Sequence, residues 1–62
     1  MCELTVYTVS GDKREKVMEG VVRLLSRDGK VHLEGILGES MEIAGNLLDI
    51  DIVAQQASIS VH

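Results

Sequence analysis

A β-hairpin is encoded by residues 27–36, which read RDGKVHLEGI. Asp28-Gly29 is the dipeptide favoured by a two-residue type I′ turn, because both of its residues must adopt positive φ. After the turn, Val31 and Leu33 alternate with polar residues such as His32, a period of two that is typical of a half-buried strand. The stretch therefore predicts two antiparallel strands joined at Asp28-Gly29 and favours an all-β fold.

Short strands are also predicted outside this hairpin. Residues 3–9 are rich in β-branched side chains, residues 41–43 alternate polar with apolar, and the apolar residues of 48–52 alternate with Asp49 and Asp51. Glycine-containing turns separate most of these segments, and the chain has no proline. We therefore expect one domain, residues 1–62, folded as a small antiparallel β-barrel or half-barrel of about five to seven short strands.

The segment 15–26 fits two structures. Its apolar residues follow the spacing of an amphipathic helix. Against a helix, Gly20 would cost about 1 kcal/mol in a helix interior, and the neighbouring pair Val21-Val22 prefers a strand. A strand bent at Gly20 is the favoured interpretation, and the helix remains the alternative.

The composition predicts an oligomer. Hydrophobic residues make up 45% of the 62 residues, yet there is no Phe or Trp and a single Tyr. A monomer of this size buries only about 60% of the surface that its unfolded chain exposes. A single cysteine excludes an intrachain disulfide, so a partner subunit is the natural source of further stability. We expect a homodimer.

Charge and motifs exclude several classes of function. The net charge of −4 and the pI near 4.9 argue against nucleic acid as a partner. The sequence contains no apolar stretch long enough to span a membrane and no signal-peptide pattern. Phosphate-loop and dinucleotide fingerprints are absent, and we expect no enzymatic activity. One unpaired thiol fits a reducing cytoplasm.

Cys2 is the candidate metal ligand. If Met1 is removed, this residue presents an α-amine and a thiol that can close a five-membered chelate ring on one metal ion. If Met1 stays, the Cys2 amide nitrogen and the Met1 amine can take the place of that amine. The thiolate is the binding species, so affinity should fall in acid. The alternative is that Cys2 is a small hydrophobic residue at the start of the first strand.

A dimer would double the donor set. Two chains related by a two-fold axis offer two sulfurs and two nitrogens, which suits one metal ion per dimer. Square-planar geometry would favour Ni(II) or Cu(II), and tetrahedral geometry would favour Zn(II). His32 and His62 are minority candidates for ligands, Asp49 and Asp51 are expected to be solvated, and Glu3 is a candidate to tune the site from outside. Met18 and Met41 are expected to fill the core.

The sequence resembles the CooT-type family of small nickel-binding accessory proteins, which are associated with maturation of carbon monoxide dehydrogenase. The resemblance implies a small β-barrel, a homodimer and nickel(II) held by Cys2 of both subunits. Such sequences have also been described as RNA-binding proteins, a description that an acidic chain with few aromatic residues does little to support. The stretches that carry the resemblance are Met1–Tyr7, Val17–Arg23, Asp28–Val31, Ile36–Glu39 and Leu48–Asp51.

We therefore predict a cytoplasmic, non-catalytic homodimer that binds one nickel ion through paired Cys2 residues and delivers it to a nickel enzyme such as carbon monoxide dehydrogenase. The competing hypothesis is a metal-independent module, in which the barrel surface binds a protein or RNA and Cys2 is structural.

Overall fold

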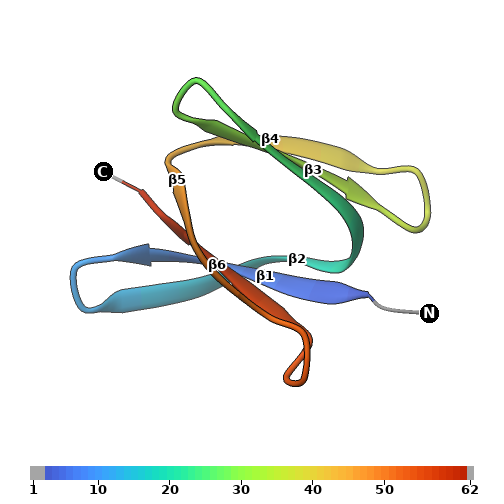
Figure 1. Ribbon diagram of the computed structural model, residues 1–62, viewed down its shortest axis with the longest axis horizontal. Helices are drawn as coiled ribbons and strands as arrows, with labels where there is room; N and C mark the ends of the chain where they lie inside the picture. Colours follow the sequence, from blue (N-terminus) through green and yellow to red (C-terminus); the bar gives the residue numbers. More distant parts are fainter. Residues whose placement is uncertain (1–2, 62) are drawn as a thin grey trace.

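Six β-strands form one sheet in the computed structural model, which describes residues 3–61 (Figure 1). Their order across the sheet is β4-β3-β2-β1-β6-β5. No helix long and apolar enough to cross a membrane occurs in this part of the chain. The strands are β1 (Leu4–Ser10), β2 (Lys13–Arg27), β3 (Lys30–Gly35), β4 (Ser40–Ala44), β5 (Asn46–Asp51) and β6 (Gln56–Ser60).

The sheet is mixed rather than purely antiparallel. Four of its neighbouring pairs are antiparallel, but β1 and β6 run parallel, with Val6 beside Ala57 and Thr8 beside Ile59. Parallel neighbours cannot be joined by a tight turn and need a long connection. Here strands β2 to β5 supply that connection. The predicted all-β class is confirmed, but the β1–β6 pair is parallel and not antiparallel as expected.

The sheet curls into a half-barrel. Its two outer strands, β4 and β5, lie at opposite edges of the strand order, yet Gly45 alone separates them in the sequence. The Gly45 amide donates to the Gly29 carbonyl at 2.8 Å, which fixes this corner against the β2–β3 turn. Figure 1 shows the chain turning from β4 into β5 there. No hydrogen-bonded ladder joins the two strands, so the half-barrel alternative is confirmed, and the homodimer remains a prediction.

β2 is one long strand that serves two partners. Residues up to Val21 pair with β1, and residues from Val21 onward pair with β3. The direction changes at Gly20, whose φ of 65° is a backbone conformation that other residues rarely adopt. Segment 15–26 is therefore a bent strand, as favoured from the sequence. The β2–β3 turn is also confirmed, since Asp28 and Gly29 have φ of 52° and 74°.

The core is small and entirely aliphatic. Its side chains come from four strands and interdigitate on the concave face of the sheet. Fully burying an aliphatic side chain of this size contributes about 1.5–3 kcal/mol, so this set supplies much of the stability of the domain. On β3, Val31 and Leu33 point inward while His32 and Glu34 lie on the outer face, as the alternation predicted. The buried residues are Val6, Val21, Val31, Leu33, Ala57 and Ile59.

Two predictions about apolar side chains need correction. Leu48 and Ile52 alternate with Asp49 and Asp51, which indicated a strand with one buried face, but they are 56% and 59% exposed. A bulge between Leu47 and Asp49 changes the register, so that Leu47 faces inward beside Ile59 and Leu48 does not. Met18 packs against the core as predicted, whereas Met41, on the outer strand β4, is 39% exposed.

Candidate functional site

The candidate metal ligand Cys2 lies outside the described residues, as do Met1 and His62. What the structure describes is the surface from which β1 starts. Glu3, the residue joined to Cys2, is exposed and leads directly into β1.

Segments from both neighbouring strands surround this end of β1. On one side, the Thr5 amide donates to the Gln55 carbonyl at 2.9 Å, which brings the β5–β6 turn alongside. On the other side lies the bend of β2, where a Cβ on Gly20 would be 3.5 Å from Glu3 Oε1 and 3.5 Å from Ile36 Cγ2. Both distances are ordinary contacts, so glycine is needed at this bend for its positive φ and not for space.

Exposed aliphatic side chains gather on these flanking segments, and we call them the apolar rim. Val53 is 96% exposed and Leu37 is 87% exposed, although the core of this small chain contains few large hydrophobic residues. Patches of this kind mark interaction sites in soluble proteins. The apolar rim consists of Val22, Ile36, Leu37, Ile52 and Val53.

Local hydrogen bonds hold both turns of the rim in place. The Ile36 amide donates to the Gly20 carbonyl at 2.8 Å, and the Leu37 amide donates to Glu39 Oε1 at 3.0 Å. In the other turn, the Ala54 amide donates to Asp51 Oδ1 at 2.9 Å. The exposed aliphatic side chains therefore stand on ordered turns, which lowers the entropy lost when a partner covers them.

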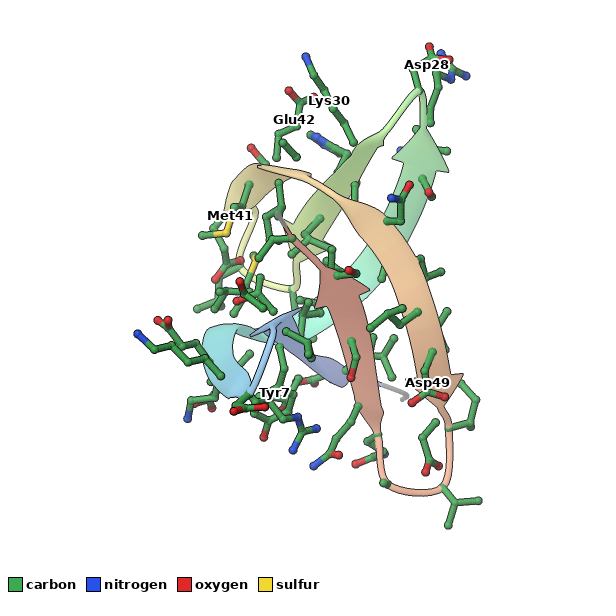
Figure 2. The ribbon with its side chains drawn as sticks, turned by 90° about the vertical axis from the view of Figure 1, so that its left-hand side faces the viewer. Tyr7, Asp28, Lys30, Met41, Glu42 and Asp49 are labelled. Carbon is green, nitrogen blue, oxygen red and sulfur yellow. The ribbon has the colours of Figure 1, made fainter. Side chains whose placement is uncertain are left out.

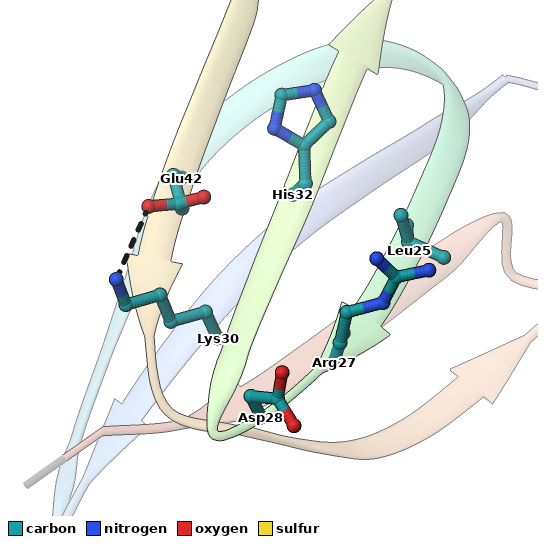
Figure 3. Close-up of a pocket in the computed structure, with 6 residues that line it drawn as sticks. All are labelled: Leu25, Arg27, Asp28, Lys30, His32 and Glu42. Atoms are coloured by element: carbon teal, nitrogen blue, oxygen red, sulfur yellow. Dashed lines mark ion pairs between the residues drawn. The ribbon is translucent and has the colours of Figure 1, made fainter.

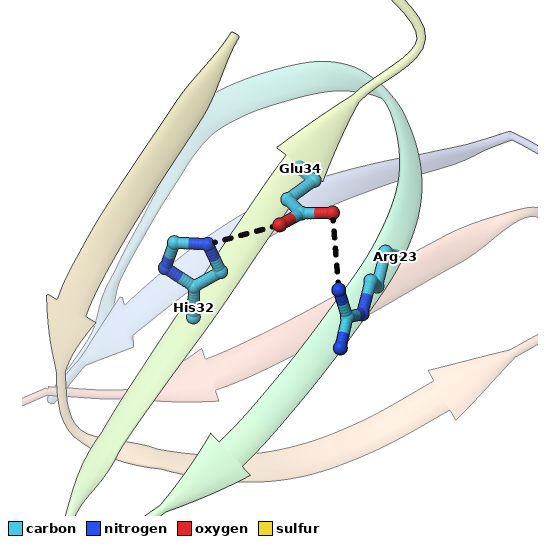
Figure 4. Close-up of polar contacts among 3 residues, drawn as sticks. All are labelled: Arg23, His32 and Glu34. Carbon is cyan, nitrogen blue, oxygen red and sulfur yellow. Dashed lines mark hydrogen bonds and ion pairs between the residues drawn. The ribbon is translucent and has the colours of Figure 1, made fainter. Parts of the chain in front are cut away.

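His32 belongs to a separate polar group on the outer face. Its Nε2 lies 3.3 Å from Glu34 Oε2, and the other oxygen of Glu34 lies 3.5 Å from Arg23 Nη1 (Figure 4). One oxygen of Glu34 thus faces the His32 ring and the other faces the Arg23 guanidinium. We therefore interpret His32 as part of a surface hydrogen-bond network and not as a metal ligand.

A shallow pocket of about 430 Å³ lies next to this group, at the β2–β3 turn (Figure 3). Both signs of charge line it, and the closest ion pair there joins Lys30 Nζ to Glu42 Oε1 at 3.8 Å. Across residues 3–61, no three His, Cys, Asp or Glu side chains come together in a way that could hold a metal ion. The pocket therefore offers neither a metal centre nor a surface of one sign of charge.

Two basic residues near the β1–β2 turn, Arg14 and Lys16, have local partners. Arg14 stacks over the Tyr7 ring at 3.9 Å from its centroid and donates to Gln56 Oε1 at 3.2 Å. Lys16 pairs with Glu19, and their hydrogen bond raises the pKa of Lys16 and lowers the pKa of Glu19. Both partners of that pair are exposed, so solvent screens the attraction and its contribution to stability is small.

The remaining candidates are Asp49 and Asp51, which the structure places on β5 with both side chains exposed, as expected. The apolar rim was not predicted from the sequence. A signal for one half of it was present, because Ile52-Val53-Ala54 is an apolar run that contains no glycine or proline yet occupies a turn.

Comparisons with known proteins bear on the whole chain. The profile of the family described as CO dehydrogenase accessory protein CooT matches residues 1–60. A crystal structure assigned as CooT from Carboxydothermus hydrogenoformans superposes with a TM-score of 0.88 and 26% sequence identity, over 98% of each chain. No curated protein matches the chain.

Proposed function

Because this chain belongs to the CooT family of CO dehydrogenase accessory proteins, we propose that it binds one nickel(II) ion as a homodimer and delivers it to a nickel enzyme. The observation that carries the proposal is the family match, which includes the Met1-Cys2-Glu3 start. The described part of the chain holds no cluster of metal-ligating side chains, so the proposal rests on Cys2 as the protein's ligand.

The donor chemistry of Cys2 explains why two chains are needed. One chain supplies a single thiolate, and the nitrogen donors next to it belong to the start of the backbone. Two chains supply two sulfurs and two nitrogens, which complete the four positions around a square-planar Ni(II) ion. The nickel is cargo in this proposal, so the site must release the ion as well as bind it.

The apolar rim supports a dimer that forms at this end of the molecule. Its five side chains lie on segments that flank the start of β1, and none is less than 44% exposed. Covering them with the same surface of a second copy would remove apolar area from water, which is the main driving force of association. A two-fold axis through this surface would also bring the two Cys2 residues toward one another.

Native mass spectrometry of the untagged protein, with and without Ni(II), tests the proposal directly. We expect a dimer that takes up one nickel ion, and the same spectrum reports whether Met1 has been removed. A dimer that takes up no metal would contradict nickel delivery and favour the metal-independent interaction module. A monomer that binds nickel with the same affinity would contradict the shared site.

A second prediction concerns the rim itself. In the Leu37→Glu/Val53→Glu variant, the dissociation constant of the dimer should rise at least about a hundredfold. The reason is that an unpaired charge buried at an interface costs about 3 kcal/mol or more. Both side chains are almost fully exposed in the single chain, so the fold should be retained. Sedimentation velocity over a range of concentrations measures the change.

The control for this experiment is Leu25→Glu. Leu25 is also an exposed aliphatic residue, at 39%, but it lies on β2 near the β2–β3 turn, away from the rim. This variant should dimerise normally. Equal weakening by the control and by the rim variant would place the dimer contact elsewhere.

A further inference from the structure

One edge of the half-barrel is open at β5. This strand is the last in the sheet order, and its only hydrogen-bonded neighbour within residues 3–61 is β6. An edge of this kind presents backbone N–H and C=O groups that can pair with another strand. The β5 edge therefore has the geometry needed to accept an added strand.

The two faces of β5 differ in chemistry. Ile50 pairs with the buried Ala57, so its side chain points toward the core, yet it is 43% exposed because no strand lies beyond it to cover it. Asp49 and Asp51 pair with Ser58 and Gln56 on the outer face, where both carboxylates are exposed. Along the open edge, apolar and acidic side chains thus alternate between the inner and the outer face.

The two carboxylates have no ion-pair partner among the described residues, whereas the outer-face carboxylate at the opposite edge does. On β4, Glu42 lies 3.8 Å from Lys30. Figure 2 shows Asp49 near one end of the molecule, far from Lys30 and Glu42 at the other. The β5 edge therefore keeps a negative charge that is available to a binding partner.

A second copy of this chain fits the β5 edge poorly. In the antiparallel register centred on Ile50, pairing of β5 with another β5 would set Asp49 of each copy opposite Asp51 of the other, and pairing with β4 can set one of these residues opposite Glu42. Like charges directly opposite one another destabilise a strand pair. The charge pattern disfavours self-pairing in these registers and favours a strand of opposite charge.

We propose that the β5 edge binds an extended segment of a partner protein in which Lys or Arg alternates with aliphatic residues. The basic side chains would pair with Asp49 and Asp51 on the outer face, and the aliphatic side chains would cover Ile50 on the inner face. This site uses neither Cys2 nor the apolar rim. Binding at this edge can therefore be measured without nickel, although Asp51 also accepts a hydrogen bond from the turn that carries Ile52 and Val53.

The test uses the full chain, labelled with nitrogen-15 and kept free of metal. The probe is a short capped peptide that alternates lysine and valine over the length of β5. During a titration followed by NMR, the largest amide shifts should fall on residues 46–51. A matched peptide with glutamate in place of lysine should bind at least about tenfold more weakly, since each cross-strand charge pair changes from attraction to repulsion.

The decisive variant is Asp49→Lys/Asp51→Asn. The asparagine keeps a side-chain oxygen for the Ala54 amide, so the turn after β5 retains its hydrogen bond. The lysine peptide should then bind at least about tenfold more weakly. Glu42→Lys on the opposite edge is the control and should leave peptide binding unchanged.

Three outcomes would overturn the proposal. They are shifts centred on β4 rather than β5, equal binding of the two peptides, and no binding up to millimolar concentration. The last would mean that Asp49 and Asp51 serve only to keep the open edge from pairing with other chains. Because the experiment involves no nickel, each outcome is separable from failure of the proposed function.

Discussion

The Cys2→Ser variant should lose tight nickel binding while it still folds and dimerises. A hydroxyl at this position keeps its proton at neutral pH and binds nickel weakly, so each dimer would lose both sulfur donors. Loss of a group that merely supports a ligand costs about 10- to 100-fold in metal affinity, and loss of the ligand itself should exceed that range. Competition with a coloured chelator measures the affinity, and native mass spectrometry reports the dimer.

The position of the thiol can be tested as well as its presence. Ser10 is exposed at the other end of β1, so the Cys2→Ser/Ser10→Cys variant keeps one thiol per chain but moves it to the opposite end of the strand. We expect this variant to bind nickel no better than Cys2→Ser alone. Unchanged affinity in Cys2→Ser, or recovery of affinity in the double variant, would reject Cys2 as the ligand.

The Gly45→Ala variant should be strongly destabilised. A Cβ on Gly45 would collide with the carbonyl oxygen of Ser60, and the obstructing atom belongs to the backbone of β6. A backbone atom cannot move aside as a flexible side chain does, so the loss should lie at or above the upper end of the roughly 1–3 kcal/mol that overpacking costs. Stability of a domain this size is about 3–9 kcal/mol in total. Urea denaturation at fixed protein concentration measures the loss.

Gly11→Ala provides the matched control for this variant. Gly11 has a φ of 60° but has nothing within 4 Å of the position of a Cβ, so the substitution strains the backbone without a collision. It should cost about 1–2 kcal/mol. Equal losses in the two variants would mean that the close approach of Gly45 to Ser60 contributes nothing specific to the fold.

The fold was most predictable where its cause is local. The Asp28-Gly29 turn and the bend at Gly20 follow from the conformational freedom of these few residues, and both are present in the structure. In segment 15–26 the apolar spacing also matched a helix, and Gly20 with Val21-Val22 correctly indicated the strand. Propensities of single residues, together with the family resemblance, narrowly favoured the strand where periodicity alone favoured a helix.

Pairing between distant segments was not predictable in the same way. Nothing in residues 4–10 or 56–60 indicates that these strands run parallel, because the apolar alternation of a strand is the same in either direction. The inward face of β5 was also assigned wrongly at Leu48. A one-residue bulge reverses which side chains face the core, and the sequence there shows a regular alternation that conceals it.

The candidate site was predicted only in part. Cys2 was singled out from its position and from the family resemblance, and it lies outside the described residues. The apolar rim was missed because Leu37 and Val53 belong to no motif in the sequence, and the turns that carry them come to flank β1 only when the sheet has formed. Unpaired surface is a property of the assembled fold, and it becomes visible only after the strands have been placed.

The parallel pair β1–β6 also sets the order in which this protein can be completed during synthesis. The ribosome makes β1 first and β6 last, and β1 gains its second neighbour only when β6 is available. The Thr5 amide likewise can form its hydrogen bond to the Gln55 carbonyl only after Gln55 has been made. Contacts this distant in the chain form slowly compared with local hairpins. The start of β1 therefore gains its full set of neighbours only after β6 has been made.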